Sequence, residues 1–210
     1  MAKVMGLREQ RVQFFYDTDF RVTGVVTTGA DLVAAEKVLF AAATPGDLSR
    51  TNMTAPGQLT SDQTFLTFAV RHECNFFPVN NTSGNSGTLF TTAEHIIWTL
   101  QSSTFQFQVS AKVEFEGPLT MTPAGGGPWG FVSDSANPLI VNGEPSSPSI
   151  YVMPLPIAIT KRQGIQMIEK KFNLPNPAAA AINIVTAINA YPGGRILRAY
   201  IDGYNTRDVL

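Results

Sequence analysis

The stretch FQFQVSAKVEF, residues 105–115, alternates apolar and polar side chains with a period of two. Successive side chains of a β-strand point to opposite faces, so this alternation predicts a strand with one buried face and one solvated or interfacial face. The polar face would carry Glu114 and Glu116. An apolar row of this length needs a second sheet to cover it, which constrains the chain to a fold of two packed β-layers. The row consists of Phe105, Phe107, Val109, Ala111, Val113 and Phe115.

Eight other apolar or alternating runs predict further strands. They lie at residues 12–16, 20–26, 64–70, 95–100, 138–141, 151–159, 165–168 and 195–204. Between the runs, stretches rich in Gly, Pro, Asn and Ser supply the turns that end strands. The sequence therefore predicts a mainly β chain, an antiparallel two-sheet sandwich of the jelly-roll type, with residues 1–210 forming a single domain.

Two segments predict short helices within this β fold. Residues 31–43 begin with a capping Asp, continue with good helix formers and are followed by Pro-Gly. Further along, Asn176 can cap a helix and Pro177 fits its first position, but the β-branched residues of INIVT favour a strand. The sequence leaves open whether Ala178–Ala190 is helix or strand.

The amino-terminal segment allows two interpretations. Residues 1–20 could form an arm that docks on a neighbouring copy or on a membrane, because the aromatic run Phe14, Phe15 and Tyr16 follows a basic stretch. Alternatively, residues 12–16 are the first strand of the core, since phenylalanine is usually buried. Under the first interpretation, the three aromatic residues belong to an interface.

Further interface candidates lie on loops and at strand ends. Trp129 occupies a Gly-rich turn, where an exposed aromatic side chain can anchor a partner or a sugar; a tryptophan half-buried at the end of the sandwich is the plainer alternative. Local positive charge could meet a partner with a negative surface, or could simply be solvated. The basic candidates are Lys161, Arg162, Arg195 and Arg198, and the carboxyl-terminal run adds Tyr204 and Arg207.

Composition narrows the class of protein. A formal net charge of −1 and a pI near 6.1 argue against a dedicated nucleic-acid binder, which needs a basic surface. The one cysteine, Cys74, cannot form an internal disulfide. Charged residues near the amino terminus interrupt the apolar stretch that a signal peptide needs, so we expect a soluble chain made inside the cell. Charged residues make up only 15% of the chain, which suits a surface buried against neighbours.

The sequence predicts no enzyme, no cofactor and no metal site. His72 and Cys74 could suggest a thiol nucleophile with its base. However, residues two apart on one strand face lie about 7 Å from each other, and a buried thiol beside a buried histidine is the plainer interpretation. Asp17 and Asp19 could bind calcium only with oxygen ligands from elsewhere. The Gly-rich AGGGPWG lacks the Lys-Ser/Thr of a phosphate-binding loop and predicts a flexible turn. In the strand that includes the histidine, we expect one shared face for Leu66, Phe68, Val70, His72 and Cys74.

Three stretches carry a resemblance to a known family. They are LSRTNMTAPGQLTSDQTFLTFAVRHEC (48–74), HIIWTLQSSTFQFQVSAKVEFEGPL (95–119) and YPGGRILRAYIDGYNTRDVL (191–210). In strand order and loop style, across most of the chain, they resemble the jelly-roll capsid proteins of tailless icosahedral bacteriophages. The resemblance implies a shell or vertex subunit of a virion, made in the host cytoplasm, with no catalytic residues. The length of 210 residues suits a single jelly roll and not a double-barrel subunit.

Two functions follow as expectations. The first is a structural virion protein that self-assembles symmetrically without catalysis, as a homo-oligomer whose partners are its own copies and other virion proteins. An internal membrane is a further candidate partner, and no specific nucleic acid is expected. The alternative is a β-sandwich module that binds carbohydrate or a receptor through Trp129 and nearby loop residues.

Overall fold

The computed structural model describes residues 8–21, 35–41, 46–59, 63–76, 99–124, 128–131, 139–142, 150–172 and 195–208. These residues are mainly β; short helical stretches lie at residues 99–101 and at the 3-10 turn η2 (Leu119–Met121). The strands are β1 (Arg8–Arg21), β2 (Glu36–Leu39), β3 (Gln63–Phe76), β4 (Ser103–Val109), β5 (Lys112–Pro118), β6 (Pro128–Phe131), β7 (Leu139–Asn142), β8 (Val152–Thr160), β9 (Ile165–Lys171) and β10 (Arg195–Asp208).

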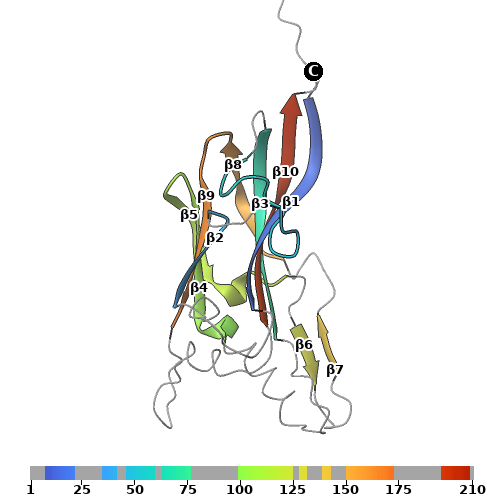
Figure 1. Cartoon of the computed structure of the whole chain (residues 1–210), viewed down its shortest axis with the longest axis vertical. Coiled ribbons are helices and arrows are strands. Elements are labelled where there is room, and N and C mark those ends of the chain that lie inside the picture. The colour runs from blue at the N-terminus through green and yellow to red at the C-terminus, as the bar shows by residue number, and fades with distance from the viewer. Residues whose placement is uncertain are drawn as a thin grey trace, which may run out of the picture.

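Two antiparallel four-stranded sheets form the body of the structure. The first sheet has the order β1-β10-β3-β8 and the second has the order β2-β9-β4-β5. Figure 1 shows them as two layers, with the β6–β7 hairpin beyond their lower end. The predicted antiparallel two-sheet sandwich is therefore confirmed.

The strands of the sandwich pair in nested order. The first strand, β1, pairs with the last, β10; β2 pairs with β9; β3 pairs with β8; and β4 pairs with β5. The small β6–β7 pair is inserted between β5 and β8. Each sheet consequently combines strands from both ends of the chain.

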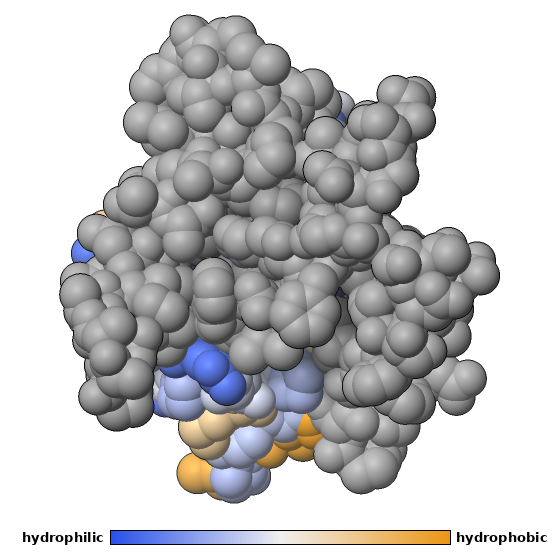
Figure 2. Space-filling view, turned by 90° about the horizontal axis from the view of Figure 1, so that it is seen from below, coloured by the Kyte–Doolittle hydropathy of each residue, from blue (hydrophilic) through white to orange (hydrophobic). Residues whose placement is uncertain are grey.

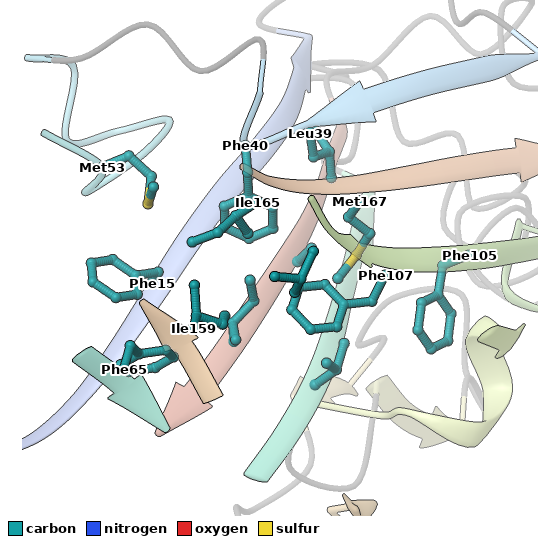
Figure 3. Packing of buried hydrophobic residues seen from close by; sticks show 14 of the residues in the cluster. Phe15, Leu39, Phe40, Met53, Phe65, Phe105, Phe107, Ile159, Ile165 and Met167 are labelled. Atoms are coloured by element: carbon teal, nitrogen blue, oxygen red, sulfur yellow. The ribbon is translucent and has the colours of Figure 1, made fainter. Parts of the chain in front are cut away.

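The hydrophobic core fills the space between the two sheets (Figure 3). Phe15 and Phe65 come from the first sheet, and Phe105, Phe107 and Met167 come from the second; all five side chains are buried. Burial stabilises the fold by about 1.5–3 kcal/mol for each side chain of this size. The alternating burial along β4 and β9 confirms that one face of each strand packs inward.

The prediction of one continuous strand over residues 105–115 is wrong. The chain reverses at Ser110 and Ala111, which have φ angles of 51° and 65°. Two left-handed residues in succession are what a two-residue hairpin turn requires. The stretch is therefore a hairpin of β4 and β5. Of the predicted row, Phe105, Phe107 and Val109 are core side chains, and Phe115 packs against the core from β5.

A β-bulge in β5 decides which of its side chains point inward. Phe107 pairs with Phe115 but Gln108 pairs with Val113, so Glu114 is an extra residue between the two pairs. The bulge turns Phe115 toward the core and leaves Val113 42% exposed on the outer side. The apolar residues of β5 thus continue the alternation of β4 in the sequence, although Val113 and Phe115 lie on opposite faces of the sheet.

β3 changes its buried face half-way along. The predicted shared face is confirmed for Val70, His72 and Cys74, which are all buried. It is wrong for Leu66 and Phe68, because the buried positions in the first half of the strand are odd-numbered. Both halves of this strand contain enough apolar residues to bury either face.

The change of face in β3 is a second β-bulge, at Phe68. The pairing of β3 with β10 passes over this residue between Asp202 and Gly203. The two backbones come so close that a Cβ atom on Gly203 would meet the carbonyl oxygen of Leu66 and, at 2.5 Å, the ring of Phe65. Only glycine fits at position 203.

Three local expectations differ from the described structure. Glu36–Leu39, inside the first predicted helix, is strand β2, because pairing with β9 overrides its helix propensity. Thr99 and Leu100, predicted as strand, are helical and lead into β4. Pro128–Phe131, expected in a flexible turn, is strand β6, held by β7. The alternatives for Ala178–Ala190 lie outside the described residues.

β1 contains most of the segment proposed as an arm. It pairs with β10 along its whole length, from Arg8 opposite Asp208 to Arg21 opposite Arg195. Residues 8–20 are therefore an edge strand of the first sheet, with Phe15 in the core. Contact of this segment with a neighbouring copy stays a prediction.

Candidate interaction surface

The outward side of the first sheet gathers aromatic rings and guanidinium groups over β1, β10 and β3. Alternation decides the placement, since Phe14 and Tyr16 point away from the second sheet while Phe15 points into the core. We call this surface the aromatic face. It consists of Phe14, Tyr16, Phe68, Arg71, Arg198, Tyr200 and Tyr204.

Three rings form the centre of the aromatic face. The ring centroids of Phe14 and Tyr16 are 6.3 Å apart, those of Phe14 and Tyr200 are 6.3 Å apart, and those of Tyr16 and Tyr200 are 6.2 Å apart. Tyr200 lies directly opposite Tyr16 in the β1–β10 register. Aromatic pairs at such distances contribute about 0.5–1.5 kcal/mol beyond their burial.

Arg71 of β3 is fixed between a carboxylate and a ring. Its Nε and Nη2 donate to the two carboxylate oxygens of Asp202, at 2.5 and 2.8 Å. Its guanidinium carbon lies 4.7 Å from the centre of the Tyr200 ring. The hydrogen bonds with Asp202 raise the pKa of Arg71. A planar, forked cation suits both contacts, and a lysine in its place would keep only the charge.

Arg198 of β10 holds the other side of the ring cluster. Its guanidinium carbon lies 5.2 Å from the centre of the Tyr16 ring, and its Nε donates to the hydroxyl of Thr18 at 2.9 Å. A carboxylate oxygen of Glu73 lies 3.9 Å from its Nη1 and accepts a hydrogen bond from the Tyr200 hydroxyl at 2.6 Å. The two arginines of the face thus each have a carboxylate neighbour, so the surface is aromatic and nearly neutral.

A loop of residues 46–53 lies along the outer edge of β1. The Asn52 side chain accepts the N–H of Tyr16 and donates to the carbonyl of Phe14, both at 2.8 Å. The Thr51 hydroxyl donates to the carbonyl of Tyr16 at 2.8 Å. An edge strand presents backbone groups that have no strand neighbour. The loop satisfies them at Phe14 and Tyr16 and holds both residues in place.

Part of the aromatic face is open to solvent. Phe14 is 48% exposed, Tyr204 is 37% exposed, and the neighbouring Leu66 and Val12 are 36% and 77% exposed. The ring of Phe68 lies 5.3 Å from that of Tyr204. Exposed apolar side chains gathered on one face mark an interaction surface, and tyrosine and arginine are enriched in protein interfaces.

The sequence-based interface candidates fall in different places. Phe14, Tyr16, Arg198 and Tyr204 meet on the aromatic face, whereas Phe15 is 6% exposed and packs in the core. Lys161 and Arg162 are exposed on the turn between β8 and β9, at one end of the sandwich. Trp129 lies on β6, and Arg195 and Arg207 lie at the two ends of β10, but the side chains of these three residues are outside the described part of the structure.

A pocket of about 530 Å³ opens between β5 and β8. Tyr151 stacks on Phe115 with ring centroids 5.1 Å apart and an interplanar angle of 6°. Leu155, which is 81% exposed, and the carboxylate-bearing Glu114 also line it. The pocket lies on the side of the sandwich and is not part of the aromatic face. Seen from below, the described part of the surface mixes hydrophilic and hydrophobic residues (Figure 2).

His72 lies in a polar part of the interior. Its Nδ1 is 2.7 Å from the Thr122 hydroxyl and its Nε2 is 3.1 Å from the sulfur of Met167, with a carboxylate oxygen of buried Glu169 at 3.9 Å. Burial lowers the pKa of His72 from its ordinary 6.5 to about 3, so the ring is neutral. Both ring nitrogens have partners other than the Cys74 thiol, which is itself buried. This arrangement does not assemble a thiolate and its base.

Asp17 and Asp19, the candidate calcium pair, face protein partners. The Asp17 carboxylate accepts the N–H groups of Phe40 at 2.6 Å and Thr18 at 3.0 Å. Burial raises the pKa of Asp17, and these two hydrogen bonds lower it. The Lys37 ammonium lies 3.8 Å from Asp19. Within the described part of the chain, no group of three or more His, Cys, Asp or Glu side chains could hold a metal ion.

Sequence reasoning missed three residues of the aromatic face, Phe68, Arg71 and Tyr200. Arg71 and Asp202 are 131 residues apart in the chain and meet only because β3 pairs with β10. A usable signal was present in RILRAYIDGY, where Leu197, Ala199 and Ile201 form the buried row. The intervening positions, including Tyr200, then had to form an outward row of charge and aromatic rings.

Comparison with family models, with curated proteins and with solved structures gave no match. The family resemblance of the sequence therefore stays a proposal, and the functional argument depends on the chain's own residues. Among the described residues, no helix is long and apolar enough to cross a membrane. What the aromatic face offers chemically is a rigid, nearly neutral contact area with aromatic anchors.

Proposed function

We propose that this protein is a structural subunit of a virion, in the shell or at a vertex, and that it acts by symmetric self-association without catalysis. The observation that carries the proposal is the aromatic face, an exposed and ordered patch on one sheet of a β-sandwich. Its partners would be other copies of the chain and other virion proteins, with an internal membrane as a further candidate. The protein would be made in the host cytoplasm and act in the virion.

The nested order of the strands supports a jelly roll as the finer description of the sandwich. A ribbon of paired strands that wraps around a barrel brings the first strand beside the last, as β1 lies beside β10. Jelly rolls form viral capsid domains and also lectin domains. The strand order is therefore consistent with both the coat subunit and the carbohydrate-binding alternative.

The charge balance favours association between identical copies. Arg71 pairs with Asp202, and Arg198 lies beside Glu73, so the charges of the aromatic face are compensated within one chain. Identical surfaces with a net charge of one sign would repel each other. The face can therefore be covered by another copy without burying an unpaired charge.

The mass of the native species tests this proposal. We expect sedimentation or light scattering, with negative-stain images, to show closed oligomers or shells. Phe14→Ser should weaken the assembly, whereas Val113→Ser, a matched change on the outer side of the second sheet, should leave it intact. A stable monomer of 22.7 kDa at high concentration would refute the proposal.

One observation favours the alternative of a carbohydrate- or receptor-binding module. The stacked rings of Phe115 and Tyr151 line the pocket between β5 and β8, and flat aromatic surfaces suit the apolar faces of sugar rings. A monomer whose tryptophan fluorescence is quenched by glycans would support this alternative. Loss of glycan binding in Tyr151→Ala would then locate the site.

A further inference from the structure

We propose that Leu48 of one copy of this chain inserts into the pocket between β5 and β8 of a second copy. This inference rests on the proposed function in one respect, that copies of the chain associate. It names two different surfaces that meet, so each copy would insert its Leu48 into one neighbour and offer its pocket to another. Such a head-to-tail contact builds a ring when the rotation between copies closes.

Leu48 is an exposed apolar side chain on the loop of residues 46–53. It is 72% exposed, and the loop lies along the outer edge of β1. The Tyr16 hydroxyl donates to the carbonyl of Leu48, so this residue borders the aromatic face. A partner that covers Leu48 would therefore also reach the margin of that face.

Hydrogen bonds fix the part of the loop that presents Leu48. The carbonyl oxygens of residues 48, 49 and 50 accept from Tyr16, Arg198 and Thr18, at 2.5, 3.1 and 2.7 Å respectively. Three successive carbonyls are thus held by side chains of β1 and β10. A side chain on a backbone that is already fixed loses less conformational entropy on binding than one on a free loop.

The pocket lies at the opposite flank of the sandwich from the loop. β1 and β8 are the two edges of the first sheet, and β2 and β5 are the two edges of the second. The Asp17 carboxylate of β1 accepts the N–H of Phe40, the residue after β2, which places β1 and β2 on one flank. The pocket is lined from β5 and β8 on the other. Copies placed side by side therefore bring the loop of one next to the pocket of the next.

The pocket suits an apolar side chain. Its volume of about 530 Å³ lies within the range of about 300–1,000 Å³ that is usual for binding pockets. Buried Met153 and the partly buried Phe115 and Ile157 line it, together with Leu155, which is 81% exposed. Inserting Leu48 would remove both leucines from water, which favours association.

The charges beside the two surfaces are complementary. Asp47 and Arg50 form an ion pair next to Leu48, with 3.4 Å between Oδ2 and Nε, and Lys112 and Glu114 form one next to the pocket, with 3.0 Å between Nζ and Oε1. One orientation of the contact places Arg50 beside Glu114 and Asp47 beside Lys112. The reverse orientation brings like charges together, so the charges select the way in which the loop enters.

Two variants, each defective at a different surface, test the contact. Leu48→Asp removes the inserted side chain and keeps the pocket, whereas Leu155→Asp places a charge in the pocket and keeps Leu48. Both positions are exposed, so both variants should fold, which circular dichroism checks. Sedimentation should show that each associates about tenfold or more weakly than the wild-type chain. Phe172→Asp, at another exposed apolar position just after β9, is the matched control and should associate normally.

Mixing the two variants tests whether the surfaces belong to one contact. The Leu155→Asp chain can insert its Leu48 into the intact pocket of the Leu48→Asp chain, while the reverse contact carries both defects. An equimolar mixture should therefore form a species of twice the chain mass that neither variant forms alone. If Leu48 instead met Leu48 of its neighbour, the mixture would contain no intact contact.

The outcomes separate as follows. A dimer that appears only in the mixture supports the inference. Wild-type association of Leu48→Asp would overturn the role of the loop. A mixture that stays monomeric, with both variants folded, would overturn the pairing of the loop with the pocket.

Charge exchange provides a test that a folding defect would not mimic. Arg50→Glu or Glu114→Arg alone would place like charges together and should weaken association about fivefold. The double exchange restores opposite charges and should restore association. Failure of the double variant to recover, with both single variants folded, would overturn the orientation of the contact.

The same samples distinguish this inference from the proposed function. Closed assemblies that persist in Leu48→Asp would retain the structural-subunit proposal and refute the contact of loop and pocket. Open chains of wild-type copies that Leu48→Asp disperses would retain the contact and refute a closed shell or vertex.

Discussion

Replacing Gly203 by alanine tests the account of the β3 bulge. The added Cβ would meet the backbone oxygen of Leu66 and the buried Phe65 ring, the latter at 2.5 Å. Neither can move away cheaply, because one is backbone and the other is fully buried. Inserting a methyl group into such a site costs about 1–3 kcal/mol or more. For a chain of this length, about 3 kcal/mol lowers the unfolding midpoint by roughly 6–12 °C.

The measurement is thermal unfolding followed by circular dichroism, with Gly164→Ala as the matched control. A Cβ atom at Gly164 meets nothing within 4 Å, so this variant should unfold within a degree or two of the wild-type protein. If Gly203→Ala is as stable as Gly164→Ala, the close approach of β3 and β10 is not a real constraint. The explanation of the face change at Phe68 would then have to be given up.

Three further changes have defined expectations. Burial keeps the pKa of His72 near 3, so only the unfolded chain takes up a proton as the pH falls below 6.5. The free energy of unfolding should therefore fall by up to about 1.4 kcal/mol per pH unit below pH 6.5. Urea unfolding of His72→Gln at several pH values should lack this contribution to the pH dependence. Arg71→Lys loses the forked contact and should cost about 1–2 kcal/mol in urea unfolding. Lys112→Ala, which removes an exposed ion pair, should change stability by less than about 0.5 kcal/mol; equal losses in these two variants would contradict the described packing. Asn52→Ala should speed hydrogen exchange of the Tyr16 amide about fivefold, and unchanged exchange would show that the loop does not close the edge.

Much of the sandwich could be predicted because its core strands alternate. The alternating Phe105, Phe107 and Val109 predict a buried strand face, and β1, β3, β8, β9 and β10 each contain an apolar run that predicted a strand. The β4–β5 hairpin could not be predicted, because Ser110 and Ala111 lack the Asn or Gly that usually marks such a turn. The bulge at Glu114 then restored the alternation beyond the turn and concealed the reversal.

The candidate surface could be predicted only in part. Phe14 and Tyr16 stand out as aromatic residues, but adjacent Phe15 looks the same in the sequence and is in the core. The sequence alone did not show which of the alternating positions of β1 face the core. The contacts of Arg71 and Arg198 depend on pairings between distant strands, which no local pattern encodes.

The nested pairing also sets the order in which the chain can fold. β4 and β5 are separated by two residues and can pair early, whereas Asn205 of β10 donates to Gln13 of β1 across 192 residues of chain. β10 is the central strand between β1 and β3, so until it is synthesised both strands lack their main neighbour. The first sheet can consequently form only when β10 pairs with both β1 and β3. On the ribosome, the surface that we propose for assembly would therefore not exist until β10 has been synthesised, which delays association of the subunits until the first sheet can form.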